Sequence, residues 1–333
     1  MKKLFLLSSI VVVISTMIGC KETKALKPNI TGSMGEVLMV MDDKWRNSDA
    51  GETMRAMLMQ PMEGLPQVEP IFNLSITPHR AFTSTMKTFR SLIVVRIADD
   101  VENEGISFQS EDNYAKGQYI IRIFAKSEEK FIEIADNNQY RIIAALLKAE
   151  LNRTRQYFRK YTDGGLHNEI EKKWGMQMIA PNIFKKMKVT PTFSWYSNET
   201  PTLSQGMFIY SFDYNSEESL SKVYLLNKRD SILKANVPGP SDGSYMTSEH
   251  ELPITYKAFD INNHYTVELR GLWKVQGDLM GGPFVTLAHL DYENSRVVVT
   301  DSYIYYPEEP KKRNYVWQME ALMQSVKFPD DKE

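Results

Sequence analysis

The first half of the chain predicts short buried strands alternating with helices. The apolar run Val37–Met41 ends at two aspartates, as a buried strand does, and residues 68–77, 91–99 and 117–126 show the same strand character. Helical spacing of apolar positions predicts helices over residues 51–60 and 81–89. In the first of these helices Met54, Met57 and Met59 favour core packing over a methionine-based metal site.

The longest helical pattern runs from residue 127 to residue 161 and predicts a break at residues 136–138, where Asp and Asn side chains can cap a new start. Beyond the break, Ile142, Leu146 and Ala149 form a broad apolar stripe. Arg153, Arg155, Arg159 and Lys160 follow, and cations near a helix carboxyl end suit the macrodipole. We interpret them as a solvated face rather than a polyanion patch.

From residue 176 the pattern changes to strands rich in valine, threonine, tyrosine and phenylalanine. Turn sequences such as Asn262-Asn263, residues 280–283 and Glu293-Asn294 link several of them, and short turns make neighbouring strands antiparallel. The predicted strands lie within residues 182–197, 206–214, 251–261, 265–277, 284–292 and 296–306.

Two helices, over residues 216–233 and 313–325, interrupt and close this run of strands. Their apolar stripes, which include Leu220 and Val223 in the first helix and Val316 and Met319 in the second, are expected to cover one face of the sheet. The fold class predicted is α+β with two α/β lobes, the second built on a largely antiparallel sheet covered by two helices. The lobes are placed at residues 34–175 and 176–328.

The amino terminus predicts export and a lipid anchor. Two lysines precede the apolar stretch from residue 4 to residue 18, which is shorter than the roughly 20 residues a membrane helix needs, so residues 1–19 are interpreted as a signal peptide. Residues 17–20, "MIGC", resemble the lipobox of bacterial lipoproteins, in which a diacylglycerol joins the cysteine sulfur before cleavage on its amino side. Cys20 is therefore the predicted lipid attachment site. An ordinary signal peptide with an accidental cysteine is the alternative.

A lipid-anchored protein without other cysteines forms no disulfide, so its fold depends on its core. Several acyl chains such as palmitate hold a protein on a bilayer firmly, whereas one chain alone is marginal. The polar residues 20–33 predict a flexible tether. By resemblance, Lys21 after the cysteine argues against inner-membrane retention and for the outer membrane, and whether the protein faces the periplasm or the cell surface stays open.

Composition supports an ordinary globular protein and excludes some partners. Hydrophobic residues make up 42% and charged residues 25% of the chain. Removing the signal peptide takes away Lys2 and Lys3, so the net charge changes from −2 to −4. Nucleic-acid binding needs a basic stripe, which the sequence lacks, so nucleic acid is not expected as a partner.

The sequence contains no recognisable catalytic motif. His79, His167, His250, His264 and His289 lack zinc-site spacing, so no metal and no cofactor are predicted, although a dispersed metal site stays open. There is no nucleophile elbow, phosphate loop or dinucleotide fingerprint. The adjacent carboxylates 42–43 and 99–100 lie at strand ends, where successive side chains point to opposite faces, and we interpret them as solvated. No catalytic residue is assigned.

Two segments are unusual enough to suggest a contact surface. Residues 269–284 hold an arginine and a tryptophan around Gly271, and a glycine inside a strand marks a bulge or a close approach. A bend with a half-buried tryptophan is the simpler interpretation. Residues 227–246 hold a proline-glycine loop after a helix, and loops on a rigid scaffold often carry function. The candidate binding surface consists of Arg229, Asp230, Tyr245, Arg270 and Trp273.

These segments also carry a resemblance. Together with the lipobox, the stretches "GLPQVEPIFNLSI", "NYAKGQYIIRI", "NKRDSILKANVPGPSDGSYM", "RGLWKVQGDLMGGPF" and "YIYYPEEPKKRNYVWQMEAL" resemble a family of Bacteroidota lipoproteins known only as domain of unknown function number 4837. The matching stretches spread over almost all of the mature chain. The resemblance implies a compartment and an intact fold, and it implies no activity, cofactor or catalytic residue.

The function expected from the sequence is that of a lipid-anchored cell-envelope protein with a binding or assembly role and no enzymatic activity. The membrane is its expected partner through the N-terminal acyl chains, and an envelope protein or a glycan is the expected ligand. The alternative is a glycan-processing envelope enzyme whose dispersed carboxylates, such as Asp230 and Glu268, converge in space.

Overall fold

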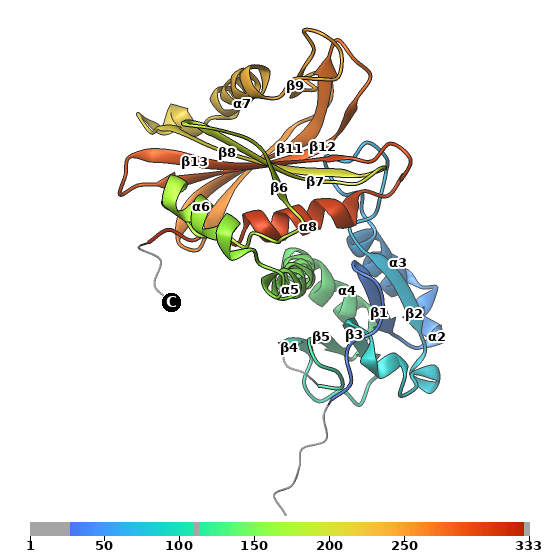
Figure 1. Cartoon of the computed structure of the whole chain (residues 1–333). Coiled ribbons are helices and arrows are strands. Elements are labelled where there is room, and N and C mark those ends of the chain that lie inside the picture. Colours follow the sequence, from blue (N-terminus) through green and yellow to red (C-terminus); the bar gives the residue numbers. More distant parts are fainter. Residues whose placement is uncertain (1–26, 110–112, 330–333) are drawn as a thin grey trace, which may run out of the picture.

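The computed structural model describes residues 27–109 and 113–329 and has two lobes, each built on its own sheet (Figure 1). Five strands form the sheet of the first lobe in the order β2-β1-β3-β5-β4, and eight strands form that of the second. The predicted α+β class with two lobes is therefore confirmed. Cys20 and the predicted signal peptide lie outside the described residues.

The sheet of the first lobe is mixed. Strands β1 (Glu36–Val40), β2 (Asn73–Thr77), β3 (Ser91–Ile97) and β5 (Tyr119–Ala125) run parallel, whereas β4 (Gly105–Gln109) pairs antiparallel with β5. Central parallel strands are buried on both faces, which explains why β1 and β3 are almost continuous apolar runs in the sequence.

Helices α2 (Asp43–Arg46), α3 (Asp49–Leu58), α4 (Glu128–Asn137) and α5 (Gln139–Arg159) belong to the first lobe. The predicted break falls where α4 meets α5, with Asn138 between them. The helix predicted over residues 81–89 is wrong: two single 3₁₀ turns, His79–Ala81 and Met86–Thr88, stand there. This stretch is rich in threonine, which has a low helix propensity.

The sheet of the second lobe is antiparallel throughout its pairs. The turn between β10 and β11 has positive φ at Asn262 and Asn263, as a two-residue hairpin with Asn-Asn requires. The order is β10-β11-β12-β13-β8-β7-β6, and β9 pairs with β11. The strands are β6 (Lys185–Thr190), β7 (Phe193–Glu199), β8 (Ser204–Asp213), β9 (Tyr245–Ser248), β10 (Thr255–Ile261), β11 (His264–Gln276), β12 (Gly281–Asp291) and β13 (Arg296–Tyr305).

Helices α7 (Lys222–Asn236) and α8 (Arg313–Met323) cover opposite faces of this sheet, not the single face expected from the sequence (Figure 1). The apolar side chains of α8 join the core that the two lobes share, and α8 lies between the second sheet and α5. Those of α7 join a separate core on the other face. Val223, assigned to the buried stripe, is 67% exposed. Apolar periodicity predicts the buried side of each helix, but it does not predict the face of the sheet against which that side packs.

The lobes meet at the amino end of α8. Glu69 of the first lobe accepts hydrogen bonds from the backbone N–H groups of Lys312 and Arg313, and Arg313 donates to the carbonyl of Pro70 at 2.8 Å. A carboxylate at a helix amino end satisfies free N–H groups and favours the macrodipole. Helix α6 (Gly164–Trp174) precedes the predicted boundary at residue 175, yet Trp174 bonds Ser194 of the second sheet. The boundary stays a prediction.

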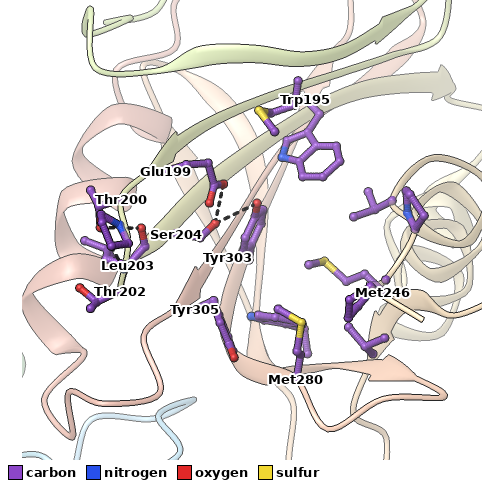
Figure 2. A pocket seen from close by; sticks show the side chains of 18 residues that line it. Trp195, Glu199, Thr200, Thr202, Leu203, Ser204, Met246, Met280, Tyr303 and Tyr305 are labelled. Atoms are coloured by element: carbon purple, nitrogen blue, oxygen red, sulfur yellow. Dashed lines mark hydrogen bonds between the residues drawn. The ribbon is translucent and has the colours of Figure 1, made fainter. Parts of the chain in front are cut away.

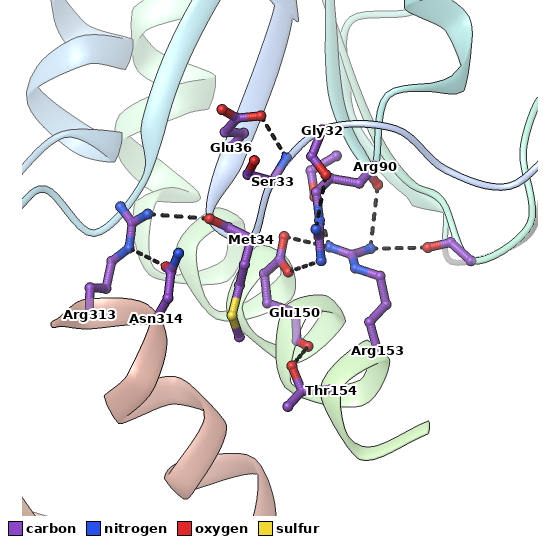
Figure 3. Close-up of polar contacts among 12 residues, drawn as sticks. Gly32, Ser33, Met34, Glu36, Arg90, Glu150, Arg153, Thr154, Arg313 and Asn314 are labelled. Carbon is purple, nitrogen blue, oxygen red and sulfur yellow. Dashed lines mark hydrogen bonds and ion pairs between the residues drawn. The ribbon is translucent and has the colours of Figure 1, made fainter. Parts of the chain in front are cut away.

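The basic end of α5 is only in part the solvated face expected from the sequence, because Arg159 and Lys160 are exposed whereas Arg153 and Arg155 are partly buried. Glu150 is buried and accepts hydrogen bonds from Arg90 at 2.6 Å and from Arg153 at 2.8 Å (Figure 3). Arg90 also bonds the carbonyl of Gly32 at 3.2 Å, and Thr31 pairs with Phe89. Part of the predicted tether is thus held against the first lobe. Among the described residues no helix has the length and apolarity to span a membrane.

Candidate functional site

A cavity of about 430 Å³ opens on the α7 face of the second sheet, where the cover provided by α7 ends (Figure 2). The chain leaves α7 at Asn236 and continues into the loop of residues 237–240, which forms one wall. The β7–β8 turn and the ends of β11 and β13 form the others. The cavity therefore exists because one helix is too short to cover one face of an eight-stranded sheet.

Aromatic and methionine side chains line most of the cavity. Its buried floor includes Trp273 and Tyr303, and the partly buried Trp195 and Tyr305 stand beside them. Three methionines add polarisable apolar surface that adapts to the shape of a ligand. Eighteen residues line the cavity, and the methionines among them are Met187, Met246 and Met280.

Two glycines make room for the aromatic floor. Gly206 pairs with Tyr303 across β8 and β13, and a Cβ on Gly206 would lie 1.8 Å from the tyrosine ring. Gly282 pairs with Trp273 across β12 and β11, and a Cβ there would lie 3.1 Å from the indole nitrogen. Each ring thus lies across a glycine of the neighbouring strand, an arrangement that fixes the position of an aromatic side chain in a sheet.

One corner of the cavity is polar (Figure 2). The carboxylate of Glu199 accepts hydrogen bonds from Ser197 and, at 2.7 Å, from Ser204, and Ser204 also bonds the hydroxyl of Tyr303 at 3.3 Å. Burial raises the pKa of Tyr303, the serine hydroxyls offset part of the rise, and the negative charge of Glu199 adds to it. The hydroxyl of Tyr303 is therefore a neutral group that both donates and accepts hydrogen bonds.

The indole N–H of Trp195 is buried beside this corner. It has no hydrogen-bond acceptor among the residues that the structure describes, although it lies close enough to lower the pKa of Tyr303 slightly. A buried donor without an acceptor costs free energy, so a ligand that offers an acceptor here gains affinity. The cavity thus combines apolar walls with a few placed polar groups, as small-molecule sites do.

Of the residues predicted to form the contact surface, only Trp273 lines this cavity. Arg270 is three residues before it on β11 and therefore points to the opposite face of the sheet, toward α8. Trp273 is only 2% exposed and donates to the carbonyl of Ile304. The prediction that Arg270 and Trp273 share one open surface is wrong, because side chains along a strand alternate. Gly271, between them, approaches Ile254 and Phe284 closely.

The other three predicted residues are placed as follows. Arg229 is completely buried between α7 and the sheet, where it binds Asp301, so it is not a surface residue. Asp230 is half-buried and accepts hydrogen bonds from the backbone of Ser248 and from His250. Tyr245 stands at a shallow hollow next to the cavity, which shares the proline-glycine loop with it. The loop predicted to carry function does border the site, although its neighbouring charged residues are structural.

The carboxylates proposed for the alternative enzyme do not converge. Asp230 binds the backbone of Ser248, which pairs with Trp273. Glu268 lies five residues before Trp273 on β11, a separation of roughly 16 Å along the strand at about 3.3 Å per residue. Glu268 instead shares Arg270 with Glu320 of α8. Burial raises the pKa of Glu320 to about 7, Arg270 offsets part of the rise, and Glu268 adds to it. This pair is buried under the α8 face and does not line the cavity.

Reasoning from the sequence missed Trp195, Glu199, Ser204, Tyr303 and Tyr305. A signal was present in "SWYS" and "YIYY", because Tyr303 and Tyr305 alternate on one face of a strand. The sequence did not show that β7 and β13 both adjoin β8. Within the described part of the chain, no cluster of three or more His, Cys, Asp or Glu residues is arranged to hold a metal ion.

The fold and the site define an α+β protein whose second lobe carries an aromatic cavity on an antiparallel sheet. Residues 165–325 match the family model described as Domain of unknown function (DUF4837), and residues 30–159 match the one described as Domain of unknown function (DUF8532). Each half of the chain thus matches a model of an uncharacterised family. The resemblance to family 4837 is confirmed for the second half, whereas "GLPQVEPIFNLSI" and "NYAKGQYIIRI" fall within the match to the other family.

No curated protein matches the chain. Among solved structures, the Ran-binding protein Mog1p of Saccharomyces cerevisiae has 10% identity and a TM-score of 0.32, over 47% of this chain and 91% of that one. A protein of Bacteroides thetaiotaomicron has 9% identity and a TM-score of 0.26, over 48% of this chain and 47% of that one.

Proposed function

We propose that the protein is a lipid-anchored, non-enzymatic binding protein of the bacterial cell envelope, and that the cavity on its second lobe receives the ligand. The sequence supports the anchor, since Cys20 ends a lipobox-like stretch and a polar segment follows it. The outer membrane is the proposed location, with the side it faces left open. The ligand is a component of the envelope, either a protein group or a glycan.

The single observation that carries this proposal is the construction of the cavity. Aromatic rings held over glycines give a preformed floor, and the polar corner at Glu199 supplies hydrogen-bonding groups at one end. A preformed site loses little conformational entropy on binding, so it recognises a ligand efficiently. The alternative of a glycan-processing enzyme receives less support, because the carboxylates with the required proximity, Glu268 and Glu320, bind a buried arginine.

Affinity capture from the protein's own envelope tests the proposal. We expect a component to be recovered with the wild-type chain and lost, at least tenfold, with Trp195→Ala, which removes one wall of the cavity. Met187→Arg, at the exposed rim, places a charge in the opening without disturbing the core and should give the same loss. Tyr140→Ala changes a tyrosine that is 85% exposed on the first lobe and should leave recovery unchanged.

Equal recovery with the wild-type chain and both cavity variants would contradict a binding role for the cavity. Thermal unfolding of each variant confirms that the loss is not one of folding. The same captured material tests the anchor by mass analysis of its amino terminus. The proposal requires acylated Cys20 as the first residue, and an unmodified cysteine or a retained signal peptide counts against it.

A further inference from the structure

The charge of the cavity restricts the chemistry of its ligand. Glu199 is the only charged side chain among the eighteen residues that line the cavity. Two lysines line the neighbouring hollow instead, where Lys188 donates to the carbonyl of Asn236 at 3.2 Å and Lys234 lies over the ring of Tyr245 at 4.9 Å. The lining therefore carries one negative charge and no positive charge, and an anionic ligand would meet no compensating charge from these walls.

The carboxylate of Glu199 has unused binding capacity. Its hydrogen bonds from Ser197 and Ser204 both reach Oε1, and among the described residues none reaches Oε2. The charge also acts inside the cavity, because it adds to the raised pKa of Tyr303. A carboxylate accepts several hydrogen bonds, so Glu199 can pair with a positively charged donor at the rim.

The aromatic rings also favour a positively charged ligand. Trp195, Tyr303, Trp273 and Tyr305 stand within one cavity, and the faces of such rings attract cations through their quadrupoles. The rings also pack edge to face on one another, with centroids 6.5 Å apart for Trp195 and Tyr303 and 5.6 Å apart for Tyr303 and Trp273, which holds them in place. Aromatic cages recognise alkylated ammonium groups in this way, and here the carboxylate of Glu199 adds an opposite charge nearby.

The apolar walls distinguish between a cation and a sugar. Met246, Met280, Val237 and Val275 line the cavity away from Glu199 and offer no hydrogen bonds from their side chains. A sugar bears hydroxyl groups on most sides and would bury several of them against these walls without partners, at a cost in free energy. A ligand with one charged end and an apolar stem meets no such cost at these four side chains.

We infer that the cavity binds an ammonium group carried on a short apolar stem, with the positive charge between Glu199 and the aromatic rings and the stem against the methionines. This inference rests on the proposed function and names the ligand class for its site. Two sources supply this chemistry, an alkylated ammonium compound and a lysine side chain of a partner protein.

Titration of the purified full chain with two matched probe pairs tests the inference. The first pair is choline and its uncharged isostere 3,3-dimethylbutan-1-ol, and the second is Nα-acetyl-lysine amide and Nα-acetyl-norleucine amide. Binding is followed by the indole N–H resonance of Trp195, assigned with Trp195→Phe. We expect at least one cation to bind tenfold or more tightly than its neutral counterpart, and the pair that shows the preference identifies the source.

Glu199→Gln keeps an acceptor oxygen for Ser204 and removes the charge. We expect it to abolish the preference for the cation while the affinity for the neutral counterpart stays within twofold. Glu293→Gln is the matched control, because it makes the same change in net charge at an exposed turn beyond the opposite end of the sheet, between β12 and β13.

Two results would overturn the inference, and they separate it from the proposed function. If the cation and its neutral counterpart bind equally, the cavity is a binding site for an apolar group and only the ligand class is wrong. If neither pair binds, the ligand class is again wrong, and loss of the captured envelope component in Trp195→Ala still decides the proposed function.

Discussion

Asp301→Ala lowers the free energy of unfolding by about 3–5 kcal/mol, the cost of leaving a buried charge without its partner. The side chain left behind is Arg229, which is completely buried and donates to Asp301 at 2.6 and 3.3 Å. It keeps a hydrogen bond to Ser248 and lies 3.8 Å over the ring of Phe284, but neither supplies a negative charge. Urea unfolding measures the loss.

A double variant separates the net contribution of the Arg229–Asp301 pair to stability from the cost of removing one partner alone. Arg229→Met with Asp301→Leu replaces both charges by apolar groups and should lose far less stability than the single variant, because no buried charge is left alone. Burial raises the pKa of Asp301 even though Arg229 opposes the rise, so desolvation is the larger influence on this carboxyl. Glu133→Ala breaks the exposed pair with Lys130 and should change stability by at most about 1 kcal/mol. A loss in Asp301→Ala no larger than this control would contradict the account of the pair.

The wild type loses stability relative to Glu320→Gln as pH rises from 5 to 8, whereas burial lowers the pKa of His289 to about 3 and so affects both proteins alike. Burial raises the pKa of Glu320 to about 7 from an ordinary value of 4.5, so the folded state holds a proton that the unfolded state releases. The stability gained from this proton is complete below pH 4.5 and is lost as pH rises through 7. The shift corresponds to a difference on the order of 3 kcal/mol.

The measurement is the free energy of unfolding of the wild type and of Glu320→Gln at a series of pH values. A neutral glutamine beside Arg270 and Glu268 keeps a hydrogen-bond acceptor and leaves one carboxylate for one guanidinium. Carboxyls whose pKa is lowered, such as Asp230, change stability below pH 4 and stay outside the window. Glu293→Gln serves as the control with the same change in charge. Parallel curves for the wild type and Glu320→Gln would show that Glu320 does not hold this proton.

Local patterns explain why much of the fold could be predicted from the sequence. Apolar runs such as Val37–Met41 mark buried strands, and the Asp-Asn-Asn stretch that ends α4 marks the break before α5, because each signal depends on neighbouring residues. The failures involve competition between weak local preferences and tertiary contacts. The threonine-rich stretch after His79 forms short turns that place Phe82, Met86 and Phe89 against Leu38, Leu92 and Ile120.

The site itself depends on pairings that a single sequence does not reveal. Trp195, Glu199 and Ser204 meet Tyr303 only because β13 pairs with β8, about a hundred residues earlier in the chain. The choice of Arg270 as a neighbour of Trp273 failed for a simpler reason, since an odd separation on a strand places two side chains on opposite faces. The alternation of side chains along a strand can be predicted from the sequence, whereas the order of the strands in the sheet cannot.

The most direct measurement for a binding role of the cavity is photo-crosslinking in the native envelope with p-benzoylphenylalanine at Tyr305, whose side chain lines the cavity and is partly exposed. The same probe at Tyr292, 76% exposed in the turn beyond the opposite end of the sheet, is the control. We expect a discrete crosslinked product at Tyr305 that Met187→Arg abolishes, and none at Tyr292. Crosslinking that is equal at the two positions, or insensitive to Met187→Arg, would contradict a binding role for the cavity.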